Sequence, residues 1–151
     1  MIEIDLSSNL QQVLQQLQEK ARELNDLSPL MQRVAGIMAD AVEENFEQQG
    51  RPRWKPLKDS TIRQRRRQGY WPGKILQQTG RLASSIESRY DKTSASVQVG
   101  GSDFPYAAIH QFGGMAGPGR TVEIPARPYL SLAEDDLKEI EEEFRVYLKG
   151  D

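Results

Sequence analysis

The chain has 151 residues, of which 37% are hydrophobic and 28% are charged, and its formal net charge is −2 at pH 7. No apolar run approaches the roughly 20 residues that span a bilayer, and the start of the chain lacks the pattern of a secretory signal, so we expect neither. Cysteine is absent, which excludes disulfides, thiolate metal cages and thiol nucleophiles.

Charge is distributed unevenly along the chain. The segment 51–81 contains ten lysines and arginines but one acid, Asp59. The first fifty residues carry nine acids against three bases, and the segment 134–144 is again acidic. A basic middle with acidic flanks favours contact with nucleic acid, or pairing between copies of the chain through complementary surfaces.

The first 24 residues predict a strand followed by a helix. Apolar residues alternate with acids over residues 2–6, which is typical of a short strand with one solvated face. Apolar residues then recur at three- and four-residue steps over 10–24, which predicts an amphipathic helix. Ser7 or Ser8 can cap that helix, because a hydroxyl satisfies one of the free N–H groups at a helix start.

A second helix is predicted over residues 28–46. Ser28 is the expected cap, Pro29 suits the first helical position, and Gly50 is the expected left-handed end. Its expected apolar side consists of Met31, Val34, Ala35, Met38, Val42 and Phe46. Because few residues separate the two helices, we expect an antiparallel helical hairpin.

The basic segment shows little periodicity. Prolines at 52, 56 and 72 exclude a continuous helix. A short helix is predicted from about Ser60 to Gln68, with Asp59 or Ser60 as cap and Gly69 at its end.

Strands are predicted beyond residue 85. Alternating apolar residues predict a hairpin with arms at 86–90 and 95–99, joined by the turn DKTS. The glycine-rich stretch 113–119 is expected to be a flexible loop, and TVEIP after it predicts another short strand.

A final helix is predicted at the end of the chain. Ser131 or a neighbour is its expected cap, and Leu137, Ile140 and Phe144 are its expected buried residues.

Together these elements predict an α+β fold in one domain, residues 1–151. We expect the N-terminal helical hairpin and the C-terminal helix to pack with a small antiparallel sheet. Its expected strands lie near 86–91, 94–100 and 120–125, with 2–6 as a candidate fourth strand. The pattern does not set the strand order.

Catalysis and metal binding are disfavoured. His110 is the single histidine, and no serine stands in the G-x-S-x-G turn of a nucleophile elbow. With one histidine and no cysteine, a metal site would need carboxylates, and the acids near the end of the chain lie all around a helix. The segments GPGR and YWPGK match no phosphate-binding motif. We therefore predict no enzyme, catalytic residue, cofactor or metal.

The basic segment supplies the first candidate contact site. Its arginines lie next to two aromatic residues in IRQRRRQGYW, a combination that can neutralise phosphates and stack on bases. Adjacent arginines point in several directions on a helix, so we expect no sequence-specific reading of DNA. The candidate residues for contact with a partner protein or with DNA are Arg63, Arg65, Arg66, Arg67 and Trp71.

The segment DFPYAAIHQFGG supplies the second candidate site. Tyr106, Ile109 and Phe112 are expected to pack on a short helical turn, with His110 at its edge. The two glycines that follow are expected to release the chain into a loop that contacts a neighbouring subunit. The candidate subunit-contact residues are Tyr106, His110, Phe112, Gly113, Gly114 and Arg127.

Five motifs occur in a characteristic order. They are WKPL from Trp54 with Thr61 soon after, ILQQTGRLASSI from Ile75, VQVGG from Val97, YAAIHQFG from Tyr106 and IPARPYL from Ile124. This series, which covers residues 50–132, resembles the phage virion morphogenesis family, the tail-completion proteins of Mu-like and related tailed phages and prophages.

The resemblance implies a structural protein of the head–tail connection or the tail terminus, without catalytic activity. Such proteins often act as rings, commonly hexameric, around the DNA channel. The implied partners are other tail or neck proteins and copies of the chain, with DNA in the channel as a non-specific contact and no membrane partner. The implied location is the virion, and the host cytoplasm during assembly. The alternative interpretation is a non-specific nucleic-acid-binding module that uses the basic segment 51–81.

Overall fold

The structure, a computed structural model, describes residues 2–3, 19, 26–100 and 106–149. It has the predicted α+β fold, with helices and two small antiparallel sheets. The helices are α2 (Ser28–Glu47), α3 (Asp59–Arg67), α4 (Ala107–Phe112) and α5 (Glu134–Lys149). The helix predicted over 10–24, and with it the predicted helical hairpin, lies outside the described residues.

The larger sheet has the strand order β1–β3–β2. Its strands are β1 (Ile2–Glu3), β2 (Glu87–Tyr90) and β3 (Ala95–Val99), and both pairings are antiparallel. The predicted hairpin is confirmed, and the Asp91 carboxylate shapes its turn by accepting the N–H groups of Thr93 and Ser94 at 2.9 and 2.7 Å. β3 is largely buried, whereas the side chains of β2 are all exposed.

The predicted strand at 120–125 does not join this sheet. It forms β5 (Val122–Ile124), which pairs with β4 (Gly114–Ala116) inside the stretch that we expected to be a flexible loop. Gly117 and Gly119 adopt positive φ, of 79° and 69°, in the turn between these strands. Pairing across a short connection loses less chain entropy than reaching the distant sheet, so the chain closes a separate hairpin.

The core lies between α2, α5 and the larger sheet. The whole apolar side predicted for α2 is buried, and α2 packs against β2, β3 and α5. On α5, Ile140 and Phe144 are fully buried and Leu137 is half-buried, as the periodicity predicts. Gly50, with φ of +101°, stands just past the end of α2 at the expected position.

A buried polar network joins α2 to α5 and to the segment before it. The Arg51 guanidinium donates to both carboxylate oxygens of Asp136, at 3.3 and 2.8 Å, and to the side-chain oxygen of Asn45 at 2.8 Å. The Asn45 amide donates to the carbonyls of Tyr129 and Ser131, at 2.7 and 2.9 Å. Every one of these groups has a partner, so the network fixes how the two helices meet.

Both long helices start differently from the prediction. Ser28 is the first residue of α2 rather than its cap, and the Asp26 carboxylate accepts its N–H at 2.8 Å. α5 begins three residues after Ser131, and the Asp136 carboxylate reaches back to the N–H of Ala133 at 2.7 Å. Carboxylates replace the expected hydroxyls because they accept these bonds and also suit the positive end of the helix dipole.

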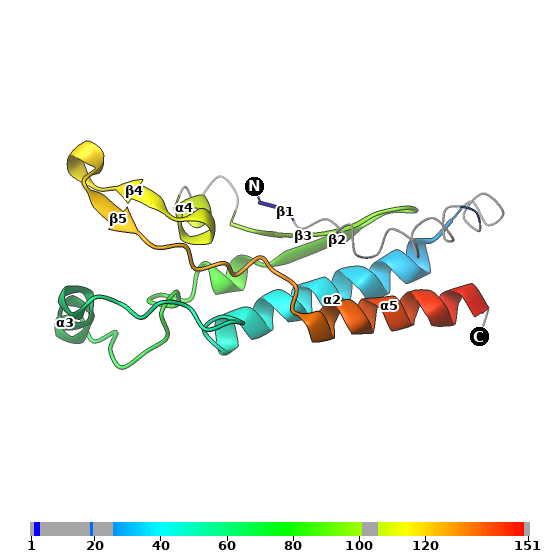
Figure 1. Ribbon diagram of the computed structural model, residues 1–151, viewed down its shortest axis with the longest axis horizontal. Coiled ribbons are helices and arrows are strands. Elements are labelled where there is room, and N and C mark those ends of the chain that lie inside the picture. The colour runs from blue at the N-terminus through cyan, green and yellow to red at the C-terminus, as the bar shows by residue number, and fades with distance from the viewer. Residues whose placement is uncertain (1, 4–18, 20–25, 101–105, 150–151) are drawn as a thin grey trace.

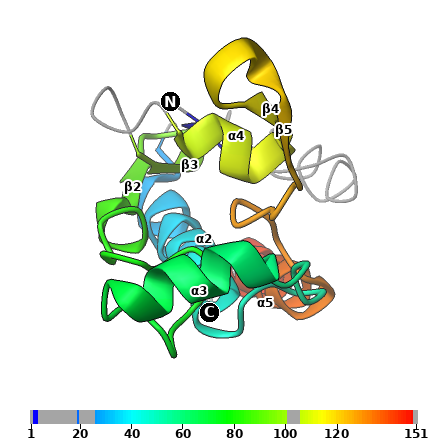
Figure 2. The same cartoon turned by 90° about the vertical axis from the view of Figure 1, so that its left-hand side faces the viewer.

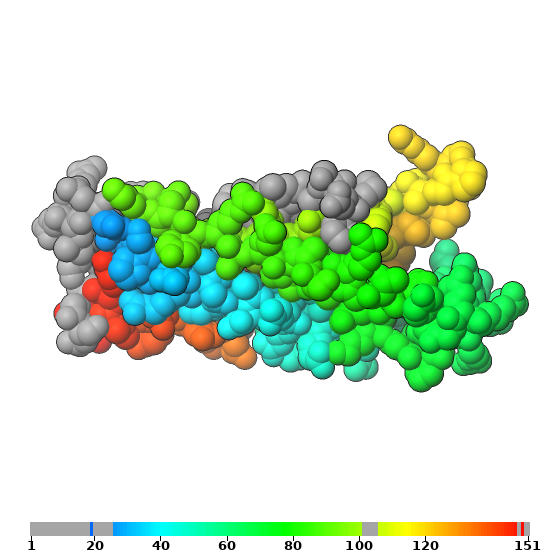
Figure 3. All heavy atoms as spheres, turned by 180° about the vertical axis from the view of Figure 1, so that it is seen from behind, coloured from blue at the N-terminus to red at the C-terminus, as the bar shows by residue number. Residues whose placement is uncertain are grey.

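The described part of the molecule is elongated (Figure 1). The antiparallel pair α2 and α5 runs along its length beside the larger sheet, while α3 and the β4–β5 hairpin lie together at one end. Viewed from that end, α3 lies below and α4 above, beside the β4–β5 hairpin (Figure 2). The space-filling view shows the hairpin and the α3 region as two projections with a notch between them (Figure 3).

Candidate subunit and nucleic-acid contact site

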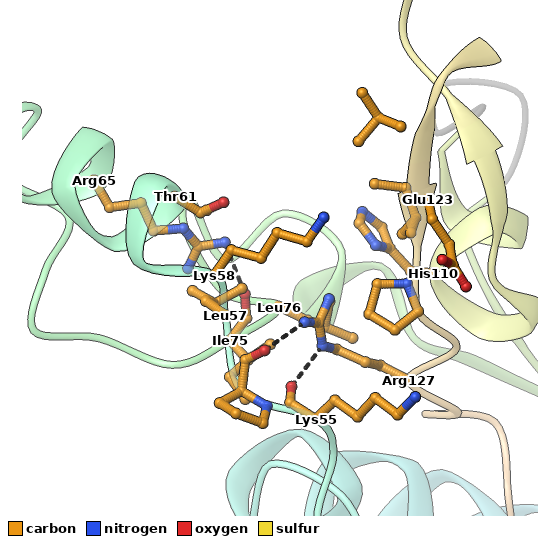
Figure 4. Close-up of a pocket in the computed structure, with 14 residues that line it drawn as sticks. Lys55, Leu57, Lys58, Thr61, Arg65, Ile75, Leu76, His110, Glu123 and Arg127 are labelled. Carbon is orange, nitrogen blue, oxygen red and sulfur yellow. Dashed lines mark hydrogen bonds between the residues drawn. The ribbon is translucent and has the colours of Figure 1, made fainter.

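A groove of about 510 Å³ lies between α3 and the β4–β5 hairpin (Figure 4). Its apolar walls come from Pro56, Leu57, Ile75, Leu76, Val122, Ile124 and Pro125. Its basic side chains are Lys55, Lys58, Arg65, His110 and Arg127, and Glu123 is its one acid among the described residues. We call this feature the cationic groove.

Arg65 holds α3 in place. The helix has no fully buried residue, and Ile62 is its one half-buried apolar side chain, so apolar packing contributes little to fixing it. Instead, the Arg65 guanidinium donates to the carbonyls of Lys74 and Ile75, at 3.0 and 2.8 Å. This arginine of the predicted contact cluster is therefore a structural residue that also lines the groove.

The other candidates of the basic segment face outward. Arg63, Arg66 and Arg67 are exposed on α3, and within the described part of the chain none of them makes an ion pair. Trp71 is half-buried just after the helix. As expected, the arginines do not share one face, because Arg65 turns inward between its exposed neighbours.

Arg127 is buried and bonded within the chain. The residue is only 6% exposed, and its side chain donates to the carbonyls of Lys55 and Pro56 at 2.9 and 3.0 Å. Nearby, Trp54 Nε1 donates to the carbonyl of Pro128 at 2.8 Å. These bonds join the WKPL motif to the IPARPYL motif.

Gln111, which the sequence analysis did not select, joins α4 to the IPARPYL segment. Its buried side-chain oxygen accepts the N–H groups of Tyr129 and Leu130, at 3.0 and 2.9 Å, and its amide donates to the Leu130 carbonyl at 3.0 Å. In addition, the Tyr129 hydroxyl donates to the carbonyl of Ala107 on α4 at 2.6 Å. Apolar periodicity carries no signal for such a residue, because its partners are backbone groups of a distant segment.

The aromatic residues of α4 do not pack as predicted. Phe112 is 69% exposed and Tyr106 is 41% exposed, although the Tyr106 ring meets His110 edge-on at 5.8 Å. Met115 and Val122 of the hairpin are also exposed. The six-residue helix buries Ala107 and Gln111, and of the three predicted packing residues only Ile109 is half-buried, while both aromatic side chains turn to the surface.

Gly113 is a close-packed position and not the start of a loose loop. Its φ is +73°, and a Cβ here would lie 2.8 Å from the backbone nitrogen of Ala126. Gly114 is exposed and begins β4. The glycine pair therefore lets α4 turn directly into the hairpin against residues 124–126.

His110 is held as a mainly neutral imidazole at the edge of the groove. Burial lowers its pKa, and the neighbouring charges of Arg127 and Arg65 lower that pKa further. Its Nδ1 is buried and has no hydrogen-bond partner among the described residues. Its backbone carbonyl accepts the Arg127 N–H at 2.8 Å, which connects α4 to the segment after β5.

His110 should make the fold less stable in mild acid. Because its pKa is lower in the folded state, the unfolded chain takes up the proton first as the pH falls below about 6.5. The free energy of unfolding should therefore fall more between about pH 7.5 and about pH 5.5 for the natural chain than for His110→Gln. Urea unfolding of both proteins measures this, and carboxylates common to both cancel. An equal pH dependence would contradict the depressed pKa.

The described part of the chain shows neither a metal-ligand cluster nor a membrane span. No three histidine, aspartate or glutamate side chains there come together as metal ligands would. None of the helices described is both long and apolar enough to cross a bilayer.

Comparison with known proteins finds relatives in phages and prophages. The sequence matches the phage virion morphogenesis family over residues 7–149. It is 44% identical over 149 residues to the Mu-like prophage FluMu G protein 2 of Haemophilus influenzae, covering 99% of this chain and 97% of that protein.

Two further relatives match more weakly. The "Putative capsid assembly protein G" of Escherichia phage Mu is 37% identical over 112 residues, covering 71% of this chain and 70% of that protein. The Mu-like prophage FluMu G protein 1 of Haemophilus influenzae is 30% identical over 132 residues, covering 84% and 83%. No solved structure shows significant similarity to the chain.

Proposed function

Because this chain belongs to the phage virion morphogenesis family, we propose that it is a non-enzymatic structural protein that completes the tail or joins the tail to the head. In this proposal it acts as one subunit of a ring, commonly a hexamer, that contacts other tail or neck proteins. It would work in the virion, after assembly in the host cytoplasm.

One observation carries the proposal: the family motifs build a fold and leave an apolar surface open. The side chains of Gln111 and Arg127 form hydrogen bonds with backbone groups of the chain itself. The side chains left outside on the same unit are Tyr106, Phe112, Met115 and Val122. Met115 and Val122 lie on opposite faces of the hairpin, because Met115 is paired with Glu123 and Ala116 with Val122. Large exposed apolar side chains on one projecting unit favour contact with another protein.

Deleting the gene from the phage or prophage that encodes it tests the proposal. Electron microscopy of induced lysates should show filled heads with separate tails, or tails of abnormal form. Normal infectious particles would refute a role in assembly. Malformed or missing heads, with tails intact, would instead support the capsid-assembly role in the name of the phage Mu relative.

Phe112→Ser should block assembly without unfolding the protein. The side chain is 69% exposed, so its loss removes little packing from the monomer but removes the largest apolar side chain of the open surface. We expect the yield of infectious particles to fall at least about tenfold, which is the effect of losing about 1.4 kcal/mol of contact energy. Plaque counts after complementation of the deletion measure this, with Tyr90→Ser as a control on the exposed strand β2. Full complementation by Phe112→Ser would show that this surface is not an interface.

The second candidate function is non-specific DNA binding, favoured by the exposed arginines of α3, which make no ion pair within the described residues. If they contact phosphates, replacing Arg63, Arg66 and Arg67 with glutamine should weaken DNA binding and reduce the salt slope by up to about three. Fluorescence anisotropy with a duplex oligonucleotide, at about 50 and about 200 mM salt, measures this.

A matched control removes the same charge elsewhere. Arg33, Arg89 and Arg145 are positioned on α2, β2 and α5, and their replacement by glutamine changes the net charge equally. Equal losses in both variants would show that only net charge matters. No retention of DNA by the natural chain at low salt would end this candidate.

A further inference from the structure

Positive groups converge in the cationic groove, where Glu123 is the one acid among the described residues. The Arg65 and Arg127 guanidinium groups line it from α3 and the segment after β5, and the mainly neutral His110 lines it from α4 (Figure 4). The two guanidinium charges affect one another, because Arg65 lowers the pKa of Arg127 in addition to the effect of burial. Glu123, the acid at the rim, is exposed and makes no ion pair among the described residues. The site therefore keeps an uncompensated positive potential.

Two buried polar atoms of the groove residues also lack partners. Arg65 Nε and His110 Nδ1 are inaccessible to solvent and have no hydrogen-bond partner in the described structure. Buried polar groups are nearly always bonded, so each of these two atoms needs a partner that the described chain does not supply. An anion accepts the N–H of Arg65 Nε, and it also satisfies His110 Nδ1 in the tautomer that carries the ring proton on that nitrogen.

The walls of the groove favour a carboxylate carried by a protein over a phosphate of DNA. Leu57, Ile75 and Ile124 make its surface apolar, and such a surface packs against side chains. A carboxylate there would be partly shielded from water, where its attraction to the arginines is stronger than in bulk solvent. A DNA backbone offers only the edges of its sugars to this space, not a side chain that can fill it.

The chain itself carries suitable carboxylates on the outer side of the α2–α5 seam. Arg33 binds Glu143 at 3.1 Å towards one end of the seam, and Arg51 binds Asp136 at 2.8 Å at the other. Helical spacing places two further acids between these pairs, Asp40 on α2 and Glu139 on α5. Both are exposed, and neither pairs with a cation in the described part of the chain.

We propose that the cationic groove of one copy receives a carboxylate from the α2–α5 seam of the next copy, with Glu139 as the principal residue. Within one molecule the groove lies at the end that holds α3, whereas the seam runs away from that end (Figure 1). Because the two surfaces differ, the contact is head to tail, and it repeats from copy to copy until a ring closes. The inference rests on the proposed ring and names the surfaces that form it.

Cross-linking tests this contact directly, because the natural chain has no cysteine. Lys58→Cys at the rim of the groove and Asp135→Cys on α5, one helical turn from Glu139, are prepared as separate single variants, so that the Glu139 carboxylate is kept, and both replaced residues are exposed. The variants are mixed as purified proteins, and are also co-produced in cells that assemble particles, before treatment with a short bismaleimide. A linked dimer of the two variants must join two copies, so a link within one copy does not interfere.

We expect at least about tenfold more linked dimer from the mixture than from either variant alone, because adjacent thiols have effective concentrations in the millimolar range. Lys58→Cys mixed with Ser88→Cys, on the exposed strand β2, is the matched control. Linked dimer at the level of this control, in solution and in particles alike, would overturn the proposal. A second result would also overturn it: duplex DNA protects the Lys58→Cys thiol from the reagent, whereas added copies of the protein do not. The anion that binds the groove would then be a phosphate.

The result is independent of the gene-deletion test. If deletion leaves heads and tails unjoined but the mixture gives no specific dimer, the proposed function stands and this contact is wrong. If deletion leaves infectious particles normal, the proposed function itself fails, whatever the cross-linking shows.

Discussion

Replacing Arg51 with methionine should lower the free energy of unfolding by about 3–5 kcal/mol, one of the two largest effects expected for a single substitution. The Arg51 and Asp136 side chains are only 14% and 10% exposed, so the change leaves an unpaired carboxylate in a nearly dry site. It also removes the hydrogen bond to Asn45, whose amide holds the segment before α5. Urea denaturation followed by circular dichroism measures the loss.

Two comparisons identify the cause of this loss. Arg145→Met breaks an exposed ion pair with Glu141 and should cost only about 0–1 kcal/mol. Adding Asp136→Asn to Arg51→Met removes the stranded charge, so the double variant should be more stable than the sum of the two single losses implies. Strict additivity would show that the pair is not coupled and that the destabilisation arises from lost packing.

Replacing Gln111 with leucine should cost a similar amount, about 3–5 kcal/mol, because each buried polar group left without a partner costs about 1–3 kcal/mol. The change keeps the side chain's size but strands the buried N–H groups of Tyr129 and Leu130, together with the Leu130 carbonyl. Thermal unfolding should show a lower midpoint, and the mutation should also loosen the attachment of the β4–β5 hairpin.

A surface glutamine provides the control for this prediction. Gln32 is exposed on α2, and Gln32→Leu should change stability by no more than about 0.5 kcal/mol. Gln111→Glu is a second probe, because a carboxylate still accepts both N–H groups but cannot donate to the Leu130 carbonyl. If the bonds that residue 111 accepts from these N–H groups contribute most of the stability, Gln111→Glu should be more stable than Gln111→Leu at high pH, where the carboxylate is ionised. A Gln111→Leu protein as stable as the natural chain would refute the assigned role.

The elements that bury apolar side chains could be predicted from the sequence. The spacing of apolar residues in α2 and α5 predicts which face of each helix meets the core. The alternation of apolar and polar residues around Val97 and Val99 does the same for β3. The order of motifs around His110 also indicated the family correctly. In these cases the signal is local, because the spacing of residues within one element determines the result.

The parts that were missed depend on polar contacts between distant segments. Arg65, Gln111 and Arg127 look like surface residues in the sequence, yet each donates to backbone carbonyls outside its own element. Phe112 was expected to pack because it is aromatic, but the six-residue helix that carries it turns Ala107 and Gln111 inward and leaves Phe112 on the surface. No pattern of residue types reveals which carbonyl a guanidinium will reach.

The way in which α3 is attached has a thermodynamic consequence. Since no residue of the helix is fully buried and Ile62 is its one half-buried apolar side chain, its detachment would expose little apolar surface and would change the heat capacity of the protein only slightly. Releasing it breaks the two Arg65 bonds and uncovers Ile62, which costs less than opening the core. The exposed arginines Arg63, Arg66 and Arg67 therefore sit on a unit that is able to adjust its orientation on a neighbour while the rest of the fold stays closed.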